Sequence, residues 1–226
     1  RRKMIKLQLP FSLPGCGVRA EVPYSAAEYP ADATEYPYAR WLMLANEAGA
    51  VGVANSGQNG FDVDPHGLLN LSLTRGGFHC AWSETDVPTD KSYTFMDQTQ
   101  IDTRFRLVSA PDADMLIDML IPAMLTLNQP FDSFFTYHGP TPRLQSAPPL
   151  LHIEPATVVL GALKQAEDGA GLIVRLSETG GQPTTAHIRF EGGDAQTFAF
   201  HPYELKTFRV SRDAGWQPVN LLEERP

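Results

Sequence analysis

Short hydrophobic runs separated by turn residues make up most of the chain. Its 19 prolines and 18 glycines divide stretches rich in Val, Leu, Phe, Tyr and Thr, which is typical of β-strands joined by turns. In residues 186–190 the apolar side chains alternate with His187 and Arg189, as in a strand with one buried face. Strands are predicted at 4–9, 41–45, 51–55, 68–74, 103–108, 157–163, 171–177, 184–190, 196–200 and 204–210.

One segment departs from this pattern. Residues 111–127 (PDADMLIDMLIPAMLTL) begin with acidic residues and continue with apolar residues three and four positions apart, which predicts a short helix near 112–126. Pro122 is expected to kink or end that helix. Met115, Met119 and Met124 are expected to pack in the core.

A change in composition divides the chain. Residues 129–149 are rich in proline and polar residues and lack a usable period, so we place a linker at 143–149. The predicted domains are 1–142 and 150–226. Their strand content predicts an all-β fold class, with a small antiparallel β-sandwich in the second domain.

Charge and composition exclude several classes of partner. The formal charge of -8 argues against nucleic-acid binding, which needs clustered Lys and Arg. No apolar run approaches the roughly 20 residues that cross a bilayer, so no membrane partner is expected. Because the first thirty residues hold no signal-peptide core and two cysteines, Cys16 and Cys80, form no disulfide framework, a cytoplasmic location is favoured.

The residues offer little sign of chemistry. The six histidines occur singly, without the spacing of a local metal site. Among the 26 acidic residues, Asp62, Asp64, Glu84 and Asp97 lie in loops or at strand ends, and their sequence context is that of solvated turn residues. The motifs of nucleotide-binding loops and serine hydrolases are missing. We therefore predict no catalytic and no metal-binding residue in this chain.

Two segments of the C-terminal half are more specific. Residues 163–181 (LKQAEDGAGLIVRLSETGG) resemble a strand-turn-strand element of the C-terminal β domain of glycoside hydrolase family 38 α-mannosidases. Asp168 and Gly169 would form the turn, with Arg175 and Glu178 on the polar side of the returning strand. Residues 201–210 (HPYELKTFRV) resemble the closing strand of that domain.

Earlier segments are similar to the family in the same order. They are residues 21–25 (EVPYS), the strand that starts at Trp41, residues 52–76 (GVANSGQNGFDVDPHGLLNLSLTRG) and residues 128–131 (NQPF). The chain departs from the family at 97–103, where a glycine, a histidine and a phenylalanine of the family pattern are replaced. The order of these segments implies that residues 1–142 form the C-terminal portion of a large β supersandwich, a galactose-mutarotase-like domain.

The resemblance implies a role in carbohydrate metabolism. Members of the family are zinc-dependent retaining enzymes whose metal ligands and aspartate nucleophile lie in an N-terminal part that this chain lacks. We therefore expect this stretch to be inactive alone and to need no cofactor, with zinc in a catalytic domain placed upstream or supplied in trans. It would stabilise and shape an α-mannoside site, and Arg75 is the residue expected to lie nearest the sugar.

Two other functions remain open from the sequence. The chain could be a stand-alone carbohydrate-binding β module, in which case Trp82 or the tyrosines at 24–38 should form an exposed aromatic platform. It could instead be an interaction subunit that docks on a separate catalytic chain, in which case a large apolar face or an unpaired sheet edge should be exposed.

Overall fold

The computed structural model describes residues 3–77, 90–92, 99–129 and 149–224. The predicted linker at 143–149 lies outside this part except for Pro149. The chain forms two compact units, Arg1–Val22 with Ala27–Asn128, and Pro23–Ala26 with Gln129–Pro226. Within the described residues, no helix is long and apolar enough to span a membrane.

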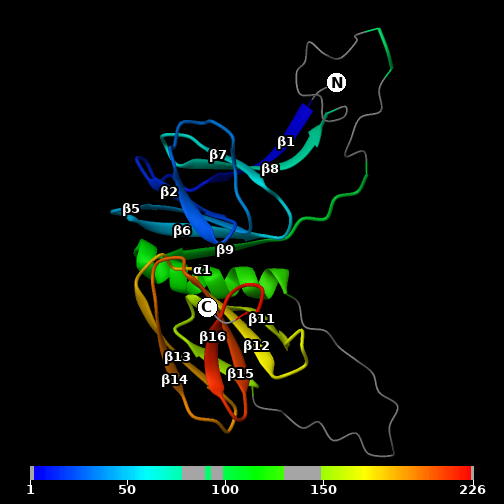
Figure 1. The fold of residues 1–226 in the computed structure, drawn as a ribbon. Helices are drawn as coiled ribbons and strands as arrows, with labels where there is room; N and C mark the ends of the chain where they lie inside the picture. The colour runs from blue at the N-terminus through cyan, green and yellow to red at the C-terminus, as the bar shows by residue number, and fades with distance from the viewer. Residues whose placement is uncertain (1–2, 78–89, 93–98, 130–148, 225–226) are drawn as a thin grey trace, which may run out of the picture. The chain divides into compact units, whose positions relative to one another are not determined.

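The first unit contains two antiparallel sheets (Figure 1). One has the strand order β1-β8-β7-β4, and the other has the order β3-β2-β5-β6-β9. The strands are β1 (Lys3–Pro10), β2 (Gly17–Val22), β3 (Ser25–Tyr29), β4 (Tyr36–Pro37), β5 (Trp41–Asn46), β6 (Gly49–Asn55), β7 (Gly60–Val63), β8 (Leu68–Gly76) and β9 (Phe105–Ala110).

The core of the first unit is shared by both sheets. Val18, Leu42 and Val53 come from the second sheet, and Phe61 and Leu71 come from the first. All five side chains are fully buried. Their positions follow the alternation of inward and outward side chains along a strand, so one face of each sheet supplies the core.

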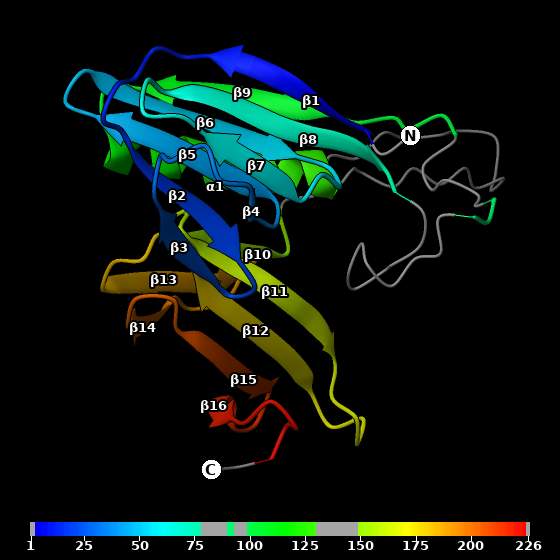
Figure 2. The same cartoon turned by 90° about the horizontal axis from the view of Figure 1, so that it is seen from above.

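Helix α1 (Ala113–Asn128) packs on β5, β6 and β9 (Figure 2). Asp112 begins it, because its Oδ1 accepts the backbone N–H of Met115 at 2.8 Å. The helix does not end at Pro122, which is half-buried and costs one intrahelical hydrogen bond. Met124 is buried, but Met115 and Met119 are 53% and 47% exposed, so the prediction that these two pack in the core is wrong.

The second unit consists of two further antiparallel sheets, with the orders β10-β13-β14 and β11-β12-β15-β16. Val174, Ile188 and Phe208 lie in a core to which both sheets contribute. The all-β prediction with one short helix is confirmed. The strands are β10 (Leu151–Glu154), β11 (Val158–Gln165), β12 (Leu172–Glu178), β13 (Thr184–Phe190), β14 (Gln196–Phe200), β15 (Leu205–Ser211) and β16 (Gly215–Val219).

Candidate functional site

Arg75, the predicted sugar-contact residue, lies near the end of β8. It is exposed and stands opposite Met4 of β1 in the antiparallel register. The described residues bring no second candidate site residue beside it, so its contact with a sugar stays a prediction.

The acidic candidates of the first unit serve structural roles. Asp62 is buried and binds Lys6 Nζ at 2.5 Å and Asn70 Nδ2 at 2.7 Å. Burial alone would lower the pKa of Lys6, but its hydrogen bonds to Asp62 and Glu35 outweigh that effect and raise the pKa. Asp64 closes a turn by accepting the backbone N–H groups of residues 66 and 68. Glu84 and Asp97 lie outside the described residues.

The described residues also do not gather a metal site. No three or more His, Cys, Asp or Glu side chains in this part of the chain are placed to hold one ion. His152 pairs with Glu191 at 3.0 Å, and His187 lies 3.2 Å from the hydroxyl of Thr197. The residues described do not fit a zinc centre, which needs three protein ligands even at an open catalytic site.

Most tyrosines of the 24–38 segment pack inward. Tyr29, Tyr36 and Tyr38 surround the buried ring of Phe61, with ring centroids 5.4, 6.3 and 5.5 Å from it. Tyr24, which is not one of these three, is 71% exposed. Tyr29, Tyr36 and Tyr38 therefore form a core and do not form the aromatic platform of a sugar-binding module. Trp82 lies outside the described residues.

The second unit carries an open groove of about 1210 Å³. One wall is the turn at Glu191–Gly193, after β13. The other wall is the turn at Arg212–Ala214, between β15 and β16, and the floor includes Leu172 and Val210. The groove thus lies between turns that belong to different sheets, and the sequence analysis did not predict it because no local motif marks it.

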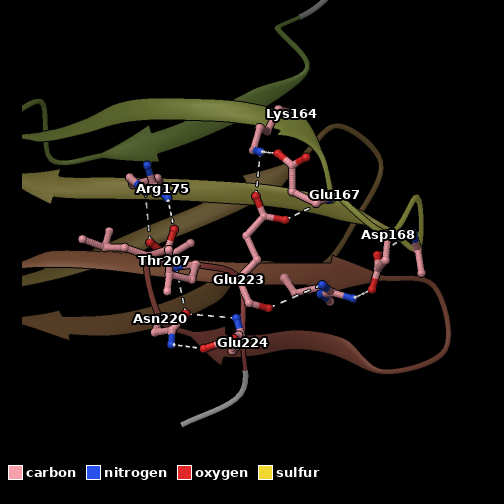
Figure 3. A network of polar contacts seen from close by, with 12 residues as sticks. Lys164, Glu167, Asp168, Arg175, Thr207, Asn220, Glu223 and Glu224 are labelled. Atoms are coloured by element: carbon pink, nitrogen blue, oxygen red, sulfur yellow. Dashed lines mark hydrogen bonds and ion pairs between the residues drawn. The ribbon is translucent and has the colours of Figure 1, made fainter.

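A polar network joins strands β11, β12 and β15 (Figure 3). Strands β12 and β15 also supply the floor of the groove. Glu223 follows β16, and its carboxylate accepts Lys164 Nζ at 2.6 Å and the backbone N–H of Glu167 at 2.9 Å. These two hydrogen bonds lower the pKa of the Glu223 carboxyl. Glu223 therefore ties the residues after the last strand to β11 and to the turn that follows β11.

Arg209 connects the network to the groove, which it also lines. Its guanidinium donates to Asp168 Oδ2 at 2.5 Å and to the backbone carbonyl of Glu223 at 3.4 Å. The hydrogen bond from Arg209 lowers the pKa of Asp168. As predicted, Asp168 and Gly169 form the β11–β12 turn, in which Asp168 Oδ1 accepts the N–H of Ala170 and Gly169 has a φ of +75°.

The segment from Asn220 to Glu224 covers the outer face of the β11-β12-β15-β16 sheet. Ile173 is fully buried although its neighbour Val174 points into the inner core, so Ile173 faces outward. It pairs in register with Lys164 on one side and with Arg209 on the other. Glu223 binds the side chains of Lys164 and Arg209. It therefore bridges the cross-strand row Lys164–Ile173–Arg209.

The structure corrects the prediction for Glu178. Arg175 does lie on the outer face, where it donates to Thr207 Oγ1 at 3.2 Å and to the carbonyl of Leu221 at 3.2 Å. Glu178, however, is only 2% exposed. Its carboxylate accepts the backbone N–H groups of Gly180, Gly181 and Tyr203, so it organises two turns instead of facing water.

A protein-family model matches the C-terminal part of the chain. Residues 157–226 match the family model of the glycosyl hydrolases family 38 C-terminal beta sandwich domain. The match contains the groove walls at 191–193 and 212–214 and the complete network around Glu223. This match confirms the resemblance drawn from residues 163–181 and 201–210.

Two solved structures have a similar fold. One is a protein in the glycosyl hydrolase family 38 from Enterococcus faecalis, with a TM-score of 0.65 and 15% identity over 91% of this chain. The other is an α-mannosidase from Enterococcus faecalis V583, with the same TM-score, identity and coverage of this chain. This chain covers 26% and 25% of those two chains. No curated protein matches it in sequence.

Proposed function

We propose that this chain is the non-catalytic C-terminal β region of an α-mannosidase-like glycoside hydrolase. The match of residues 157–226 to the C-terminal β-sandwich domain of family 38 carries this proposal. The solved structures of similar fold support it, because this chain covers only about a quarter of each. The remainder of such an assembly would supply the zinc and the nucleophile.

The contacts of the described residues agree with a supporting role. Asp62 is bound by Lys6 and Asn70, and Glu178 and Glu223 are held by backbone N–H groups. Retaining glycoside hydrolysis needs a pair of carboxyl groups about 5–5.5 Å apart that face the sugar. Carboxylates already held in this way stabilise turns and strands, and in the proposed assembly they keep the β region rigid beside the substrate site.

Complementation tests the proposal. The purified chain, assayed with 4-nitrophenyl α-mannoside in the presence and absence of Zn²⁺, should release no nitrophenol. A catalytic part of the complete enzyme that lacks this region should be inactive or unstable, and adding the purified chain should restore zinc-dependent hydrolysis. Zinc-dependent turnover by the chain alone would refute the proposal, as would a catalytic part whose activity and stability are complete without the chain.

One observation favours attachment to a separate catalytic chain. Strand β1 lies at the edge of its sheet, and within the described residues its outer edge has no partner strand. Met4 and Ile5 on this strand are 37% and 58% exposed. Such an edge can accept a strand from another polypeptide.

A substitution on β1 distinguishes docking on a separate catalytic chain from covalent linkage alone. Ile5→Lys should weaken association between the chain and a separately expressed catalytic part, measured by light scattering and by restored hydrolysis. Leu107→Lys is the matched control, since Leu107 is 53% exposed on β9, which is also an edge strand. Equal effects of the two substitutions would argue against docking through β1.

A further inference from the structure

The lining of the groove in the second unit carries no net charge. Its charged residues balance, because Glu191 and Asp213 are matched in number by Arg209 and Arg212. A site for phosphate or another strong anion would carry an excess of Arg or Lys, and a site for a cation would carry an excess of acids. The balance therefore favours a neutral ligand over an ionic one.

The floor of the groove adds an apolar surface. Leu172 is 39% exposed, and Val210 and Phe190 are partly exposed beside it. The Phe190 ring is backed by Trp216, with centroids 5.6 Å apart. A pyranose ring presents C–H groups on its faces and hydroxyls around its rim, so it matches an apolar floor between polar walls.

Both walls leave polar groups available for hydroxyls. Gly192 and Gly193 have no side chain to cover the backbone of their turn, which is closed by the N–H of Gly193 donating to the carbonyl of Phe190 at 3.0 Å. On the facing turn, Arg212 and Asp213 are exposed and make no hydrogen bond or ion pair with other described residues. That turn is held by the N–H of Ala214, which donates to Ser211 Oγ at 3.2 Å.

The groove is also fixed in place from behind. Arg209 is restrained by Asp168 and by the carbonyl of Glu223, and Glu223 is itself bound by Lys164. Preformed walls and floor reduce the entropy lost when a flexible ligand is ordered. The volume of about 1210 Å³ exceeds the roughly 300–1,000 Å³ of common small-molecule pockets, so the groove has room for more than one sugar ring.

We propose that this groove binds a short neutral oligosaccharide, away from any site of hydrolysis. Arg212 and Asp213 would bind hydroxyls from one wall, backbone groups of Gly192 and Gly193 from the other, and the sugar faces would rest on Leu172 and Phe190. The inference goes beyond the proposed function, which is tested by hydrolysis in the complete enzyme and stands or falls independently of sugar binding here.

Titration by nuclear magnetic resonance tests this site. Isotope-labelled chain is titrated with α-mannotriose and with maltotriose, and the amide signals of Gly192, Gly193, Asp213 and Ala214 are followed. Saturable shifts at these amides with at least one trisaccharide are expected. No saturable shift with either sugar, or shifts confined to residues outside the groove, would overturn the inference.

Matched substitutions test whether the trisaccharide binds in the groove. Ala214→Trp places a large side chain in the groove and should lower the affinity by about tenfold or more. Ala48→Trp is the control, because Ala48 is also exposed in a hairpin turn, donates its N–H to a nearby side-chain oxygen and precedes a glycine of positive φ. Affinity equal to that of the unsubstituted chain is expected for Ala48→Trp, and an equal loss in both variants contradicts the assignment.

A milder variant distinguishes a loss of binding from misfolding. Asp213→Ala removes an exposed side chain that has no partner among the described residues, so it should leave the dispersed amide spectrum intact. It should weaken trisaccharide binding by about tenfold or more, as expected for one lost hydrogen bond to a charged group. Binding that is unaffected by Asp213→Ala, Arg212→Ala and Ala214→Trp would rule out the groove.

Discussion

The carboxylate of Glu223 accepts the backbone N–H of Glu167 at 2.9 Å, although the two residues are 56 positions apart. Glu167 lies just before the Asp168–Gly169 turn, and Glu223 follows the last strand. Their contact ties the segment after the last strand to the turn that follows β11. The first prediction concerns the ionisation of the Glu223 side chain.

Glu223→Gln should destabilise the chain at neutral pH and have a smaller effect in acid. Lys164 and the N–H of Glu167 lower the pKa of Glu223 in the folded state, so its stabilising contribution is present above the unfolded pKa and is lost as pH falls through the folded pKa. Urea unfolding of both proteins between neutral pH and roughly pH 3 should show their free energies of unfolding converging below about pH 4.

The control for this experiment is Glu47→Gln. Glu47 is exposed in the turn between β5 and β6, and makes no hydrogen bond or ion pair with other described residues. Its substitution should leave the free energy of unfolding nearly unchanged at every pH. If the free energy of unfolding of Glu223→Gln differs from that of the unsubstituted chain by the same amount down to pH 3, the role assigned to the charge of Glu223 is contradicted.

Gly67→Ala should destabilise the first unit more than Gly57→Ala. Both glycines have positive φ, +81° and +105°, so each substitution carries a backbone cost of about 1 kcal/mol. A Cβ at Gly67 would also stand 2.5 Å from the backbone nitrogen of Leu13, whereas Gly57 faces open space. In chemical denaturation, Gly67→Ala should lose about 1–3 kcal/mol more of its free energy of unfolding than Gly57→Ala. Equal losses would show that the backbone at Leu13 moves away from the added Cβ at no cost in stability.

Glu21→Ala should cost about 2 kcal/mol of stability. Glu21 is 7% exposed, and its Oε2 accepts the backbone N–H of Arg40 at 2.7 Å while the Arg40 guanidinium binds the same carboxylate. Truncation leaves that partly buried N–H without its acceptor.

Glu28→Ala is the comparison for Glu21→Ala in the same unfolding assay. The Glu28 side chain is 75% exposed and reaches Arg19 only at 3.9 Å, so a loss of about 0–1 kcal/mol is expected. Similar losses for the two alanine variants would show that the Arg40 contacts add little to the stability of this unit.

Cys16 should be unreactive in the folded chain. It is 7% exposed and free, and burial raises the pKa of its thiol, which lowers the fraction of reactive thiolate. In a Cys80→Ser background, a disulfide reagent such as dithionitrobenzoate should label Cys16 slowly in buffer and rapidly in urea. Rapid labelling without denaturant would mean that the region around Leu13 and Cys16 opens readily.

Sequence patterns predicted the strands whose side chains alternate or whose apolar runs lie between clear turns. The prediction at 184–190 coincides with β13, and Ala186 and Ile188 are buried there as expected. The strand at β16, which contains Pro218, was not predicted. Proline is compatible with that strand since β16 lies at the edge of its sheet, a position that the local sequence does not reveal.

The candidate site was less predictable than the fold. The turn at Asp168 and Gly169 could be predicted from its residue types, because an Asp-Gly pair favours a tight turn. The contacts of Glu223 could not, since they join residues that are 56 positions apart. The groove depends on the spatial approach of turns from two sheets, for which neither turn carries a signal of its own.

The position of Glu223 has a consequence for synthesis of the protein. Chains emerge from the ribosome in order, and domains fold as their residues become available. Lys164, Ile173 and Arg209 are synthesised before Glu223, so the row that they form cannot be bridged until residue 223 has been made. A nascent chain halted at Val219 would thus contain every strand of the unit but lack the residue that bridges this row.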